Sequence, residues 1–425
     1  MKFKGFNLFI LLFLLCSFSS KASFVLLPME TGGQQNHLKA YGITYWALDK
    51  NYKVSWLLNY RGGSFLLPDA PEIRKECQIR GVTFEVLSDA TTNSILDEIS
   101  SPSQNMETVV LEKAPKIAVY TPKGKQPWDD AVTMVLTYAE IPFAKVYDEE
   151  VLSDQLLLYD WLHLHHEDFT GQYGKFFGNY RSTPWYIQQK ADAEALAKKL
   201  GYNKVSQAKL AVAKKIRDFV IGGGFMFAMC SATDSFDIAL SAEGVDICEP
   251  MFDGDDSDAN YQTRIDYSNT FAFKDYTLVR NPMVYEFSDI DTTEQHGKGA
   301  FTMDKDYFTL MEYSAKWDPI PTMLCQNHTQ LVKGFMGQTT AFEAEKIKSN
   351  VLVMGECKIN GEARYIHGTK GKGMFTFYGG HDPEDYQHRV GDAPTVLDLH
   401  PNSPGYRLIL NNVLFPAARK KKLKT

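Results

Sequence analysis

The sequence predicts an α/β protein whose main domain is a doubly wound parallel sheet. Two observations favour this fold. After Pro115, short apolar runs alternate with amphipathic stretches, which is the rhythm of βαβ units. The composition is also that of a globular protein, with 44% hydrophobic and 23% charged residues. A chain of 425 residues is expected to form two or three domains, or one enlarged α/β domain.

Residues 1–22 have the pattern of a signal peptide. Lys2 and Lys4 precede an apolar run over residues 6–18, and small residues around Ala22 offer a cleavage site. An uncleaved anchor, or a lipid attached at Cys16, is the alternative. No later run reaches 18 apolar residues, so we expect no transmembrane segment in the mature chain. The expected location is outside the cytoplasm, in a periplasm, at the cell surface or secreted.

Residues 23–113 predict a small N-terminal α/β unit. Its apolar runs are short, and Gly, Pro and Ser punctuate them. The strands are expected at residues 23–28, 53–58, 64–67 and 82–87, and the helices at residues 37–48, 71–81 and 91–99.

The main domain is expected to comprise residues 114–249 and 371–418. Its strands are predicted at residues 116–120, 143–147, 159–165, 225–229 and 372–378, and its helices at 128–139, 188–200, 206–219, 234–242 and 405–415. Active sites of such sheets lie outside the carboxyl ends of the strands. Residues 121–126, 165–169 and 230–233 should therefore share one rim. Residues 250–370, which begin with an acidic stretch, are predicted to be a large insertion.

Cys230 is the first candidate for a catalytic role. It follows the apolar run Phe225–Met229 and precedes a predicted helix. A helix N-terminus lowers the pKa of a thiol and offers backbone donors to an oxyanion. The alternative is a small buried hydrophobic side chain.

Two segments carry a resemblance to a known family. They are the run that ends Ala228-Met229-Cys230-Ser231-Ala232, and the segment 374–382 (MFTFYGGHD) with its closing helix over 406–415. Both resemble the class I glutamine amidotransferase-like superfamily, nearest its trehalose-utilisation-type branch. The resemblance implies a flavodoxin-like doubly wound sheet.

The same resemblance implies Cys230 as a nucleophile, with His381 and Glu384 as its catalytic partners. The chain departs from the family pattern in two places. Ala228 and Ala232 stand where the family has glycines, and His381 and Glu384 are three residues apart instead of two. Two functions follow. One is an exported Cys-dependent hydrolase or amidotransferase-like enzyme. The alternative is a non-catalytic binding or scaffold protein of the cell envelope, linked to carbohydrate by analogy only.

A second constellation lies at residues 163–168 (HLHHED). His163 and His165 share one face of a strand, while His166 and Asp168 share the other. His163, His165 and Asp168 are the candidate ligands of a transition metal at the rim. Two ligands do not make a site, and the third would come from His381 or Asp382. A hydrogen-bonded polar strand end is the alternative.

Two further segments admit two interpretations each. Asp253, Asp255 and Asp258 have the carboxylate density of a calcium loop, although a solvated acidic loop is the alternative. The aromatic residues between 173 and 186 form either a lid over the rim or the core of the insertion.

The charge balance bears on partners. Lys and Arg number 45 against 52 Asp and Glu, a net charge of −7, so no basic surplus exists for nucleic acid. A small molecule or a glycan is the expected ligand. No cofactor is firmly implied beyond the calcium or transition-metal ion considered above.

Overall fold

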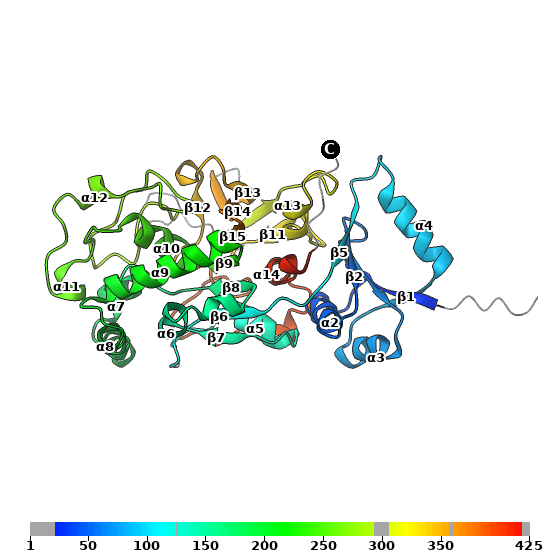
Figure 1. Cartoon of the computed structure of the whole chain (residues 1–425), viewed down its shortest axis with the longest axis horizontal. Helices are drawn as coiled ribbons and strands as arrows, with labels where there is room; N and C mark the ends of the chain where they lie inside the picture. Colours follow the sequence, from blue (N-terminus) through cyan, green and yellow to red (C-terminus); the bar gives the residue numbers. More distant parts are fainter. Residues whose placement is uncertain (1–21, 125, 293–305, 358–360, 419–425) are drawn as a thin grey trace, which may run out of the picture.

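Two β-sheets organise the chain in the computed structural model, which describes residues 22–124, 126–292, 306–357 and 361–418 (Figure 1). The first sheet lies within the residues expected to form the small N-terminal unit. Its strand order is β4-β1-β3-β2-β5, and every pairing in it is antiparallel. Its elements are β1 (Ala22–Leu27), α2 (His37–Asp49), β2 (Val54–Leu58), β3 (Ser64–Pro68), α3 (Pro71–Arg80), β4 (Glu85–Ser88), α4 (Asp89–Ser100) and β5 (Glu107–Leu111).

The second sheet carries the chain from residue 117 onwards. Its order is β11-β10-β13-β14-β15-β9-β8-β6-β7, with β12 paired to β14. The parallel part is built by β6 (Ile117–Tyr120), α5 (Ala131–Tyr138), β7 (Ala144–Val146), α6 (Asp148–Leu152), β8 (Trp161–Leu164), α7 (Phe177–Tyr180), α8 (Pro184–Lys199), α9 (Val205–Gly222), β9 (Phe225–Met229), α10 (Ala232–Ser241), β15 (Gly373–Tyr378) and α14 (Pro404–Leu414).

Five neighbouring strands of this sheet run parallel. β15 pairs with β9, β9 with β8, β8 with β6 and β6 with β7, each in parallel register. The parallel sheet expected around Phe225–Met229 is therefore confirmed. Strand β9 is an apolar run (FMFAM) with both neighbours parallel, which suits a strand covered on both faces.

Each face of the parallel strands is covered by helices. Ile117 and Val119 of β6 belong to one apolar core, together with side chains of α2, α5 and α14. Ala118 and Tyr120 point the other way, into a core shared with α9 and α10. Alternating residues of one strand thus enter opposite cores, as the pleat of a strand requires.

The segment expected to be an insertion contributes to the same sheet, which the sequence did not predict. β10 (Tyr307–Leu310), β11 (Leu331–Lys333), β13 (Leu352–Cys357) and β14 (Glu362–Lys370) extend the sheet beyond β15 with antiparallel pairings. The sheet as a whole is therefore mixed. The other elements of this segment are short: α11 (Pro250–Asp253), α12 (Tyr261–Arg264), α13 (Pro319–Leu324) and β12 (Phe342–Glu343).

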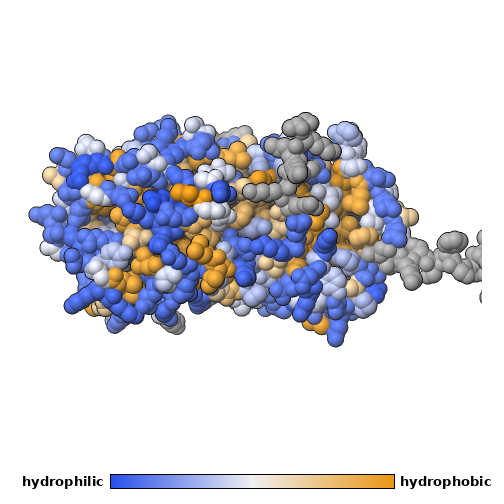
Figure 2. All heavy atoms as spheres, in the orientation of Figure 1, coloured by the Kyte–Doolittle hydropathy of each residue, from blue (hydrophilic) through white to orange (hydrophobic). Residues whose placement is uncertain are grey.

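The surface of the molecule is mostly polar. Figure 2 shows hydrophilic side chains over much of the viewed face, with apolar side chains in separate patches. Within the described ranges, no helix combines the length and the apolar character that a membrane span needs. The signal peptide expected at residues 1–22 lies outside the described residues except for Ala22, where β1 begins.

Candidate metal centre

A row of imidazole rings lies at the carboxyl ends of β8 and β15. His163 is in β8, and His165 follows the last residue of that strand. Both rings are buried, with 0% and 1% exposure. His163 Nδ1 is 3.1 Å from the carbonyl oxygen of Phe227 on the neighbouring strand, and His163 Nε2 is 3.4 Å from His165 Nδ1.

His381 reaches the same place from β15. The chain leaves this strand through Gly379 and Gly380, and Gly380 has a φ of 93°. A Cβ at Gly380 would collide with the Phe335 ring, so only glycine fits there. His381 Nδ1 lies 3.1 Å from His165 Nε2, and His381 Nε2 lies 3.1 Å from Asp129 Oδ1.

The His166 ring makes no hydrogen bond within the described part of the chain. Both of its ring nitrogens are buried, and neither has a hydrogen-bond partner in the described part of the chain. The ring lies against Trp128, and its Nε2 is 3.8 Å from Glu167 Oε1, which is too long for a hydrogen bond. Nitrogen atoms of His165, His166 and His381 all lie within 4.8 Å of one another. A buried imidazole without a partner points to a ligand of its own.

A second group shares His165. Asp130 Oδ2 lies 3.6 Å from His163 Nε2, and Asp130 Oδ1 lies 3.6 Å from His165 Nδ1. Asp130 is held at the start of α5, where its side chain accepts the backbone N–H of Thr133 at 2.8 Å. The N-cap requirement of that helix thus fixes the carboxylate beside the two rings.

The hydrogen bonds along this row need more protons than neutral rings supply. Four contacts connect the Phe227 carbonyl, His163, His165, His381 and the Asp129 carboxylate in sequence. Each contact needs one proton, but three neutral imidazoles carry only three. Either an extra proton or a metal cation between two ring nitrogens would satisfy the row.

Burial disfavours the extra proton. Burial, together with the nearby His165 and His388 rings, lowers the pKa of His381 to about 3. Burial likewise holds the pKa of His166 well below its usual value. Burial also opposes the charge of Asp130, but His163 and His165 facing it keep its pKa well below the usual range. The low pKa values of His166 and His381 favour neutral rings, which is the state in which imidazole binds a divalent metal.

Cys230 sits at the expected turn between β9 and α10, with a φ of 50°. Its backbone N–H donates to the Gly380 carbonyl at 3.2 Å, so the two strand ends are adjacent. Its sulfur, however, accepts the backbone N–H of Gln338 at 3.3 Å. Among the described residues, no hydrogen bond joins the thiol to the His381 ring. Burial raises the thiol pKa to about 11, although backbone donors at Thr339 and Gln338 lower it in part.

The other expected partners have different contacts. Glu384 lies 3.1 Å from His400 Nδ1 and accepts the Tyr386 hydroxyl at 2.7 Å, whereas the carboxylate that His381 faces belongs to Asp129. Asp168 accepts the backbone N–H groups of Thr170 and Gly174 and so caps the loop after β8. Asp382 accepts the Tyr406 hydroxyl at 2.8 Å.

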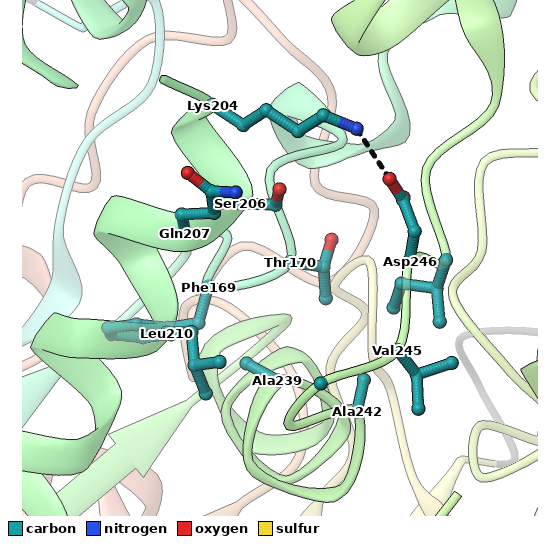
Figure 3. Close-up of a pocket in the computed structure, with 12 residues that line it drawn as sticks. Phe169, Thr170, Lys204, Ser206, Gln207, Leu210, Ala239, Ala242, Val245 and Asp246 are labelled. Atoms are coloured by element: carbon teal, nitrogen blue, oxygen red, sulfur yellow. Dashed lines mark hydrogen bonds and ion pairs between the residues drawn. The ribbon is translucent and has the colours of Figure 1, made fainter. Parts of the chain in front are cut away.

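In the acidic loop, a lysine ammonium occupies the position expected of a calcium ion. Lys204 Nζ lies 2.5 Å from Asp246 and from Asp255, and 3.0 Å from Asp253. Asp258 pairs with Arg264 at 2.5 Å. Figure 3 shows the Lys204–Asp246 pair at one edge of a pocket of about 190 Å³.

The aromatic residues after β8 form a cluster against the centre. Phe176 stacks on Trp128 with ring centroids 5.0 Å apart, and Trp185 meets both rings edge-on. Because Trp128 also lies against His166, this cluster covers the imidazole row on one side. His388 covers it from the loop after β15, stacked 3.6 Å from His381.

A cleft of about 360 Å³ opens beside the centre. Its walls are the loops after β6 and β8, α8 and α9, and they include Gln126, Glu167, Tyr173, Trp185, Gln189 and Lys209. Glu167 connects the two places, since it lines the cleft and also faces His166. The crevice outside the carboxyl ends of parallel strands is where α/β sheets bind ligands.

Sequence reasoning missed Asp129, Asp130 and His388, and it placed His166 on the opposite face of the strand. The strand was expected to run to His165, but β8 ends at Leu164. The chain therefore turns before His166 and brings that ring to the same side. The sequence did contain a signal for the two carboxylates, because Asp129 and Asp130 directly precede the first helix of the domain, where an N-cap residue is expected.

Comparisons with known proteins assign the chain to no family. No family model matches the chain, and no curated protein matches it. Two solved structures have a similar outline at a TM-score of 0.35: cytoplasmic proteins STM3548 and STM1381 of Salmonella typhimurium, at 10% and 12% identity. Each match covers 72% of this chain and all of the other. A similarity this weak supports no statement about function.

Proposed function

We propose that this protein binds a divalent transition-metal ion, zinc in the first place, through His165, His166 and His381, and uses it in a hydrolytic reaction. The observation that carries the proposal is the His166 ring, which lies beside two other imidazoles. Both of its nitrogens are buried and have no hydrogen-bond partner among the described residues. Imidazole nitrogen is a preferred ligand of zinc.

The spacing of the rings supports this choice. With Zn–N bonds of about 2.0–2.1 Å, two ligands of a tetrahedral ion lie about 3.3–3.4 Å apart. His165 Nε2 and His381 Nδ1 are 3.1 Å apart, so a small outward movement of the rings would admit the ion. Asp129 would keep the far nitrogen of His381 protonated and its ring oriented, as carboxylates do behind many metal ligands.

Three histidine ligands leave a fourth position for water or substrate, which is the pattern of catalytic zinc sites. A zinc ion held here would supply a water of lowered pKa. The chain's own residues would hold the ligands, exclude bulk water through Trp128 and its aromatic neighbours, and admit a small polar molecule through the adjacent cleft. A glycan is one such molecule.

We also propose that the fold is the flavodoxin-like doubly wound sheet that the resemblance to the class I glutamine amidotransferase-like superfamily implies. The parallel strands lie in the order second, first, third, fourth and fifth along the chain, which is the flavodoxin-like order. Helices on both faces agree with it. We further propose that the chain is exported, because the expected signal segment ends where β1 begins.

A Cys230 nucleophile is the second candidate, favoured by the φ of 50° at the turn after β9. The raised pKa of the thiol and its contact with Gln338 argue against a reactive thiolate at neutral pH. A non-catalytic binding protein is the third, and it is favoured by the near-complete burial of the rings.

Metal analysis and an activity screen separate these candidates. Protein purified without chelator is analysed for zinc, and then screened against chromogenic ester, amide and glycoside substrates before and after chelation. We expect bound zinc and activity that is lost on chelation. His166→Gln should lose the activity and bind less zinc than the wild type, whereas Cys230→Ser should keep both. Activity lost in Cys230→Ser with zinc unchanged would support the thiol instead. Bound zinc without activity on any of these substrates would support the non-catalytic binding protein.

A further inference from the structure

We infer that the centre takes two divalent metal ions, one on each side of His165, with that imidazole as the bridge. The inference rests on the proposed function, because it extends the same centre. It assigns a second site to Asp130, His163 and His165, beside the first site at His165, His166 and His381.

The groups of the second site are spaced closely enough to share one metal ion. Its two ring nitrogens are 3.4 Å apart, and each lies 3.6 Å from a different oxygen of the Asp130 carboxylate, His163 Nε2 from Oδ2 and His165 Nδ1 from Oδ1. Tetrahedral zinc with bonds of about 2.0–2.2 Å needs ligand separations of about 3.3–3.6 Å. The separations of the two nitrogens from each other and from the carboxylate fall in this range.

The residues behind this site orient its ligands. His163 Nδ1 donates to the Phe227 carbonyl, which leaves the lone pair of Nε2 facing Asp130 and His165. Asp130 Oδ1 receives the backbone N–H of Thr133, while Oδ2 faces His163. Supporting contacts of this kind fix the tautomer and direction of metal ligands.

His165 can serve both sites because its two nitrogens face different groups. Nε2 faces His381, and Nδ1 faces His163 and Asp130. Coordination through both nitrogens releases the ring's one N–H proton to solvent and leaves an imidazolate. Two divalent ions then face the negative charges of the imidazolate, Asp129 and Asp130. This near balance is what a buried charged site requires.

The bridge also explains the ring contacts of the centre. The row of imidazoles is one proton short when each ring is neutral. An ion between His163 and His165, and another between His165 and His381, would replace the two inter-ring hydrogen bonds with metal–nitrogen bonds. Two donors, the N–H groups of His163 Nδ1 and His381 Nε2, would then remain for the two outer contacts, to the Phe227 carbonyl and to Asp129, and these contacts need two.

Metal stoichiometry tests the inference on the full chain. Apoprotein is loaded with excess Zn²⁺, desalted and analysed by plasma mass spectrometry. We expect two zinc ions per wild-type chain, one in His163→Gln and in Asp130→Asn, and one in His381→Gln. His367→Gln is the matched control, since that buried histidine bonds Thr376 and lies outside the centre. It should keep both ions, and thermal melting confirms that each variant is folded.

Loading with Cu²⁺ tests the bridge itself. Two coppers joined by one imidazolate are magnetically coupled, so the paramagnetic resonance signal of the wild type should be weaker than two isolated ions give. His163→Gln should restore the full signal of one copper. One zinc per wild-type chain, or two zinc ions retained in His163→Gln, would overturn the inference and leave the proposed function standing. No zinc in the wild type would overturn both.

Discussion

Two regions in the described part of the chain have the residue types of a metal site. In only one of them do the described residues place no lysine or arginine against the candidate ligands. In the loop around Asp253, the carboxylates surround Lys204, whose ammonium compensates them. At the rim of the parallel strands, imidazoles face one another, and Asp129 and Asp130 face the same rings. The difference teaches that ligand-like residues indicate a metal only where no side chain already supplies the positive charge.

The largest expected effect is the loss of metal affinity at the rim. Removing one imidazole from a three-histidine site should weaken zinc binding by more than about 100-fold, since changes even behind a ligand cost about 10–100-fold. Competition with a chromogenic chelator would measure this for His166→Gln. Asp253→Asn is the comparison variant, and its affinity for zinc should equal that of the wild type.

Equal loss in both variants would contradict the distinction between the two regions. Equal weakening of zinc binding in both variants is the result expected if zinc binds acidic side chains and imidazoles without preference.

Removing Lys204 should convert the acidic loop into the metal site that its sequence resembles. Lys204→Met leaves Asp246, Asp253 and Asp255 without their cation, and we expect a loss of about 1–3 kcal/mol in the free energy of unfolding. Millimolar Ca²⁺ should restore the stability of this variant while leaving the wild type unchanged. Thermal melts with and without Ca²⁺ measure both effects.

Lys214→Met is the matched control, because Lys214 pairs with a single exposed carboxylate, Glu243. Its stability should change by less than about 1 kcal/mol and should not respond to Ca²⁺. A wild-type chain that is itself stabilised by Ca²⁺ would show that Lys204 does not fill the loop.

A third cluster extends the comparison to histidines that already face a cation. His37 and His328 stack with ring centroids 4.3 Å apart, and Arg407 lies 3.4 Å from His328 Nδ1. Burial, aided by Arg407, lowers the pKa of His37 to about 4 and that of His328 to about 3. The unfolded chain binds protons at both rings from about pH 6.5 downwards, whereas the folded chain does not.

Stability from these two rings is therefore complete above about pH 6.5 and is lost as the pH falls towards 4. Chemical denaturation at intervals from pH 7.5 to 4.5 should show a smaller decline in His328→Gln than in the wild type. The same decline in both would mean that these rings titrate normally in the folded chain.

The smallest expected effect concerns Cys230. Because burial raises its pKa to about 11, a thiol reagent at pH 7 should label it only after unfolding. Cys357, which is partly exposed, should be labelled first in the native protein. Peptide mass mapping gives the order, and rapid labelling of Cys230 would restore it as a candidate nucleophile.

Much of the fold could be predicted because local patterns decide it. The apolar run Phe225–Met229 became strand β9 with the same ends, and the parallel pairing followed from the βαβ rhythm. The antiparallel extension by β10 to β14 was missed, because pairing partners far apart in sequence leave no local signal. Strand β5 was missed as well, since it lies just beyond a polar loop.

The site was predictable only in part for a similar reason. His163 and His165 share a strand face, so their proximity could be inferred from the pleat. Their link to His381 followed from strand ends sharing one rim. Asp129 and Asp130 come from a loop whose path depends on the capping of α5, and His166 depends on where β8 ends. Neither feature can be located to a single residue from sequence.

The most direct test is a crystal of the zinc-loaded protein, with diffraction recorded on both sides of the zinc absorption edge. We expect an anomalous peak within about 2.0–2.2 Å of ring nitrogens of His165, His166 and His381. A second peak between His163, His165 and Asp130 would support the bridged pair. An absence of anomalous density at these rings, with His165 and His381 still in hydrogen-bond contact, would contradict the account.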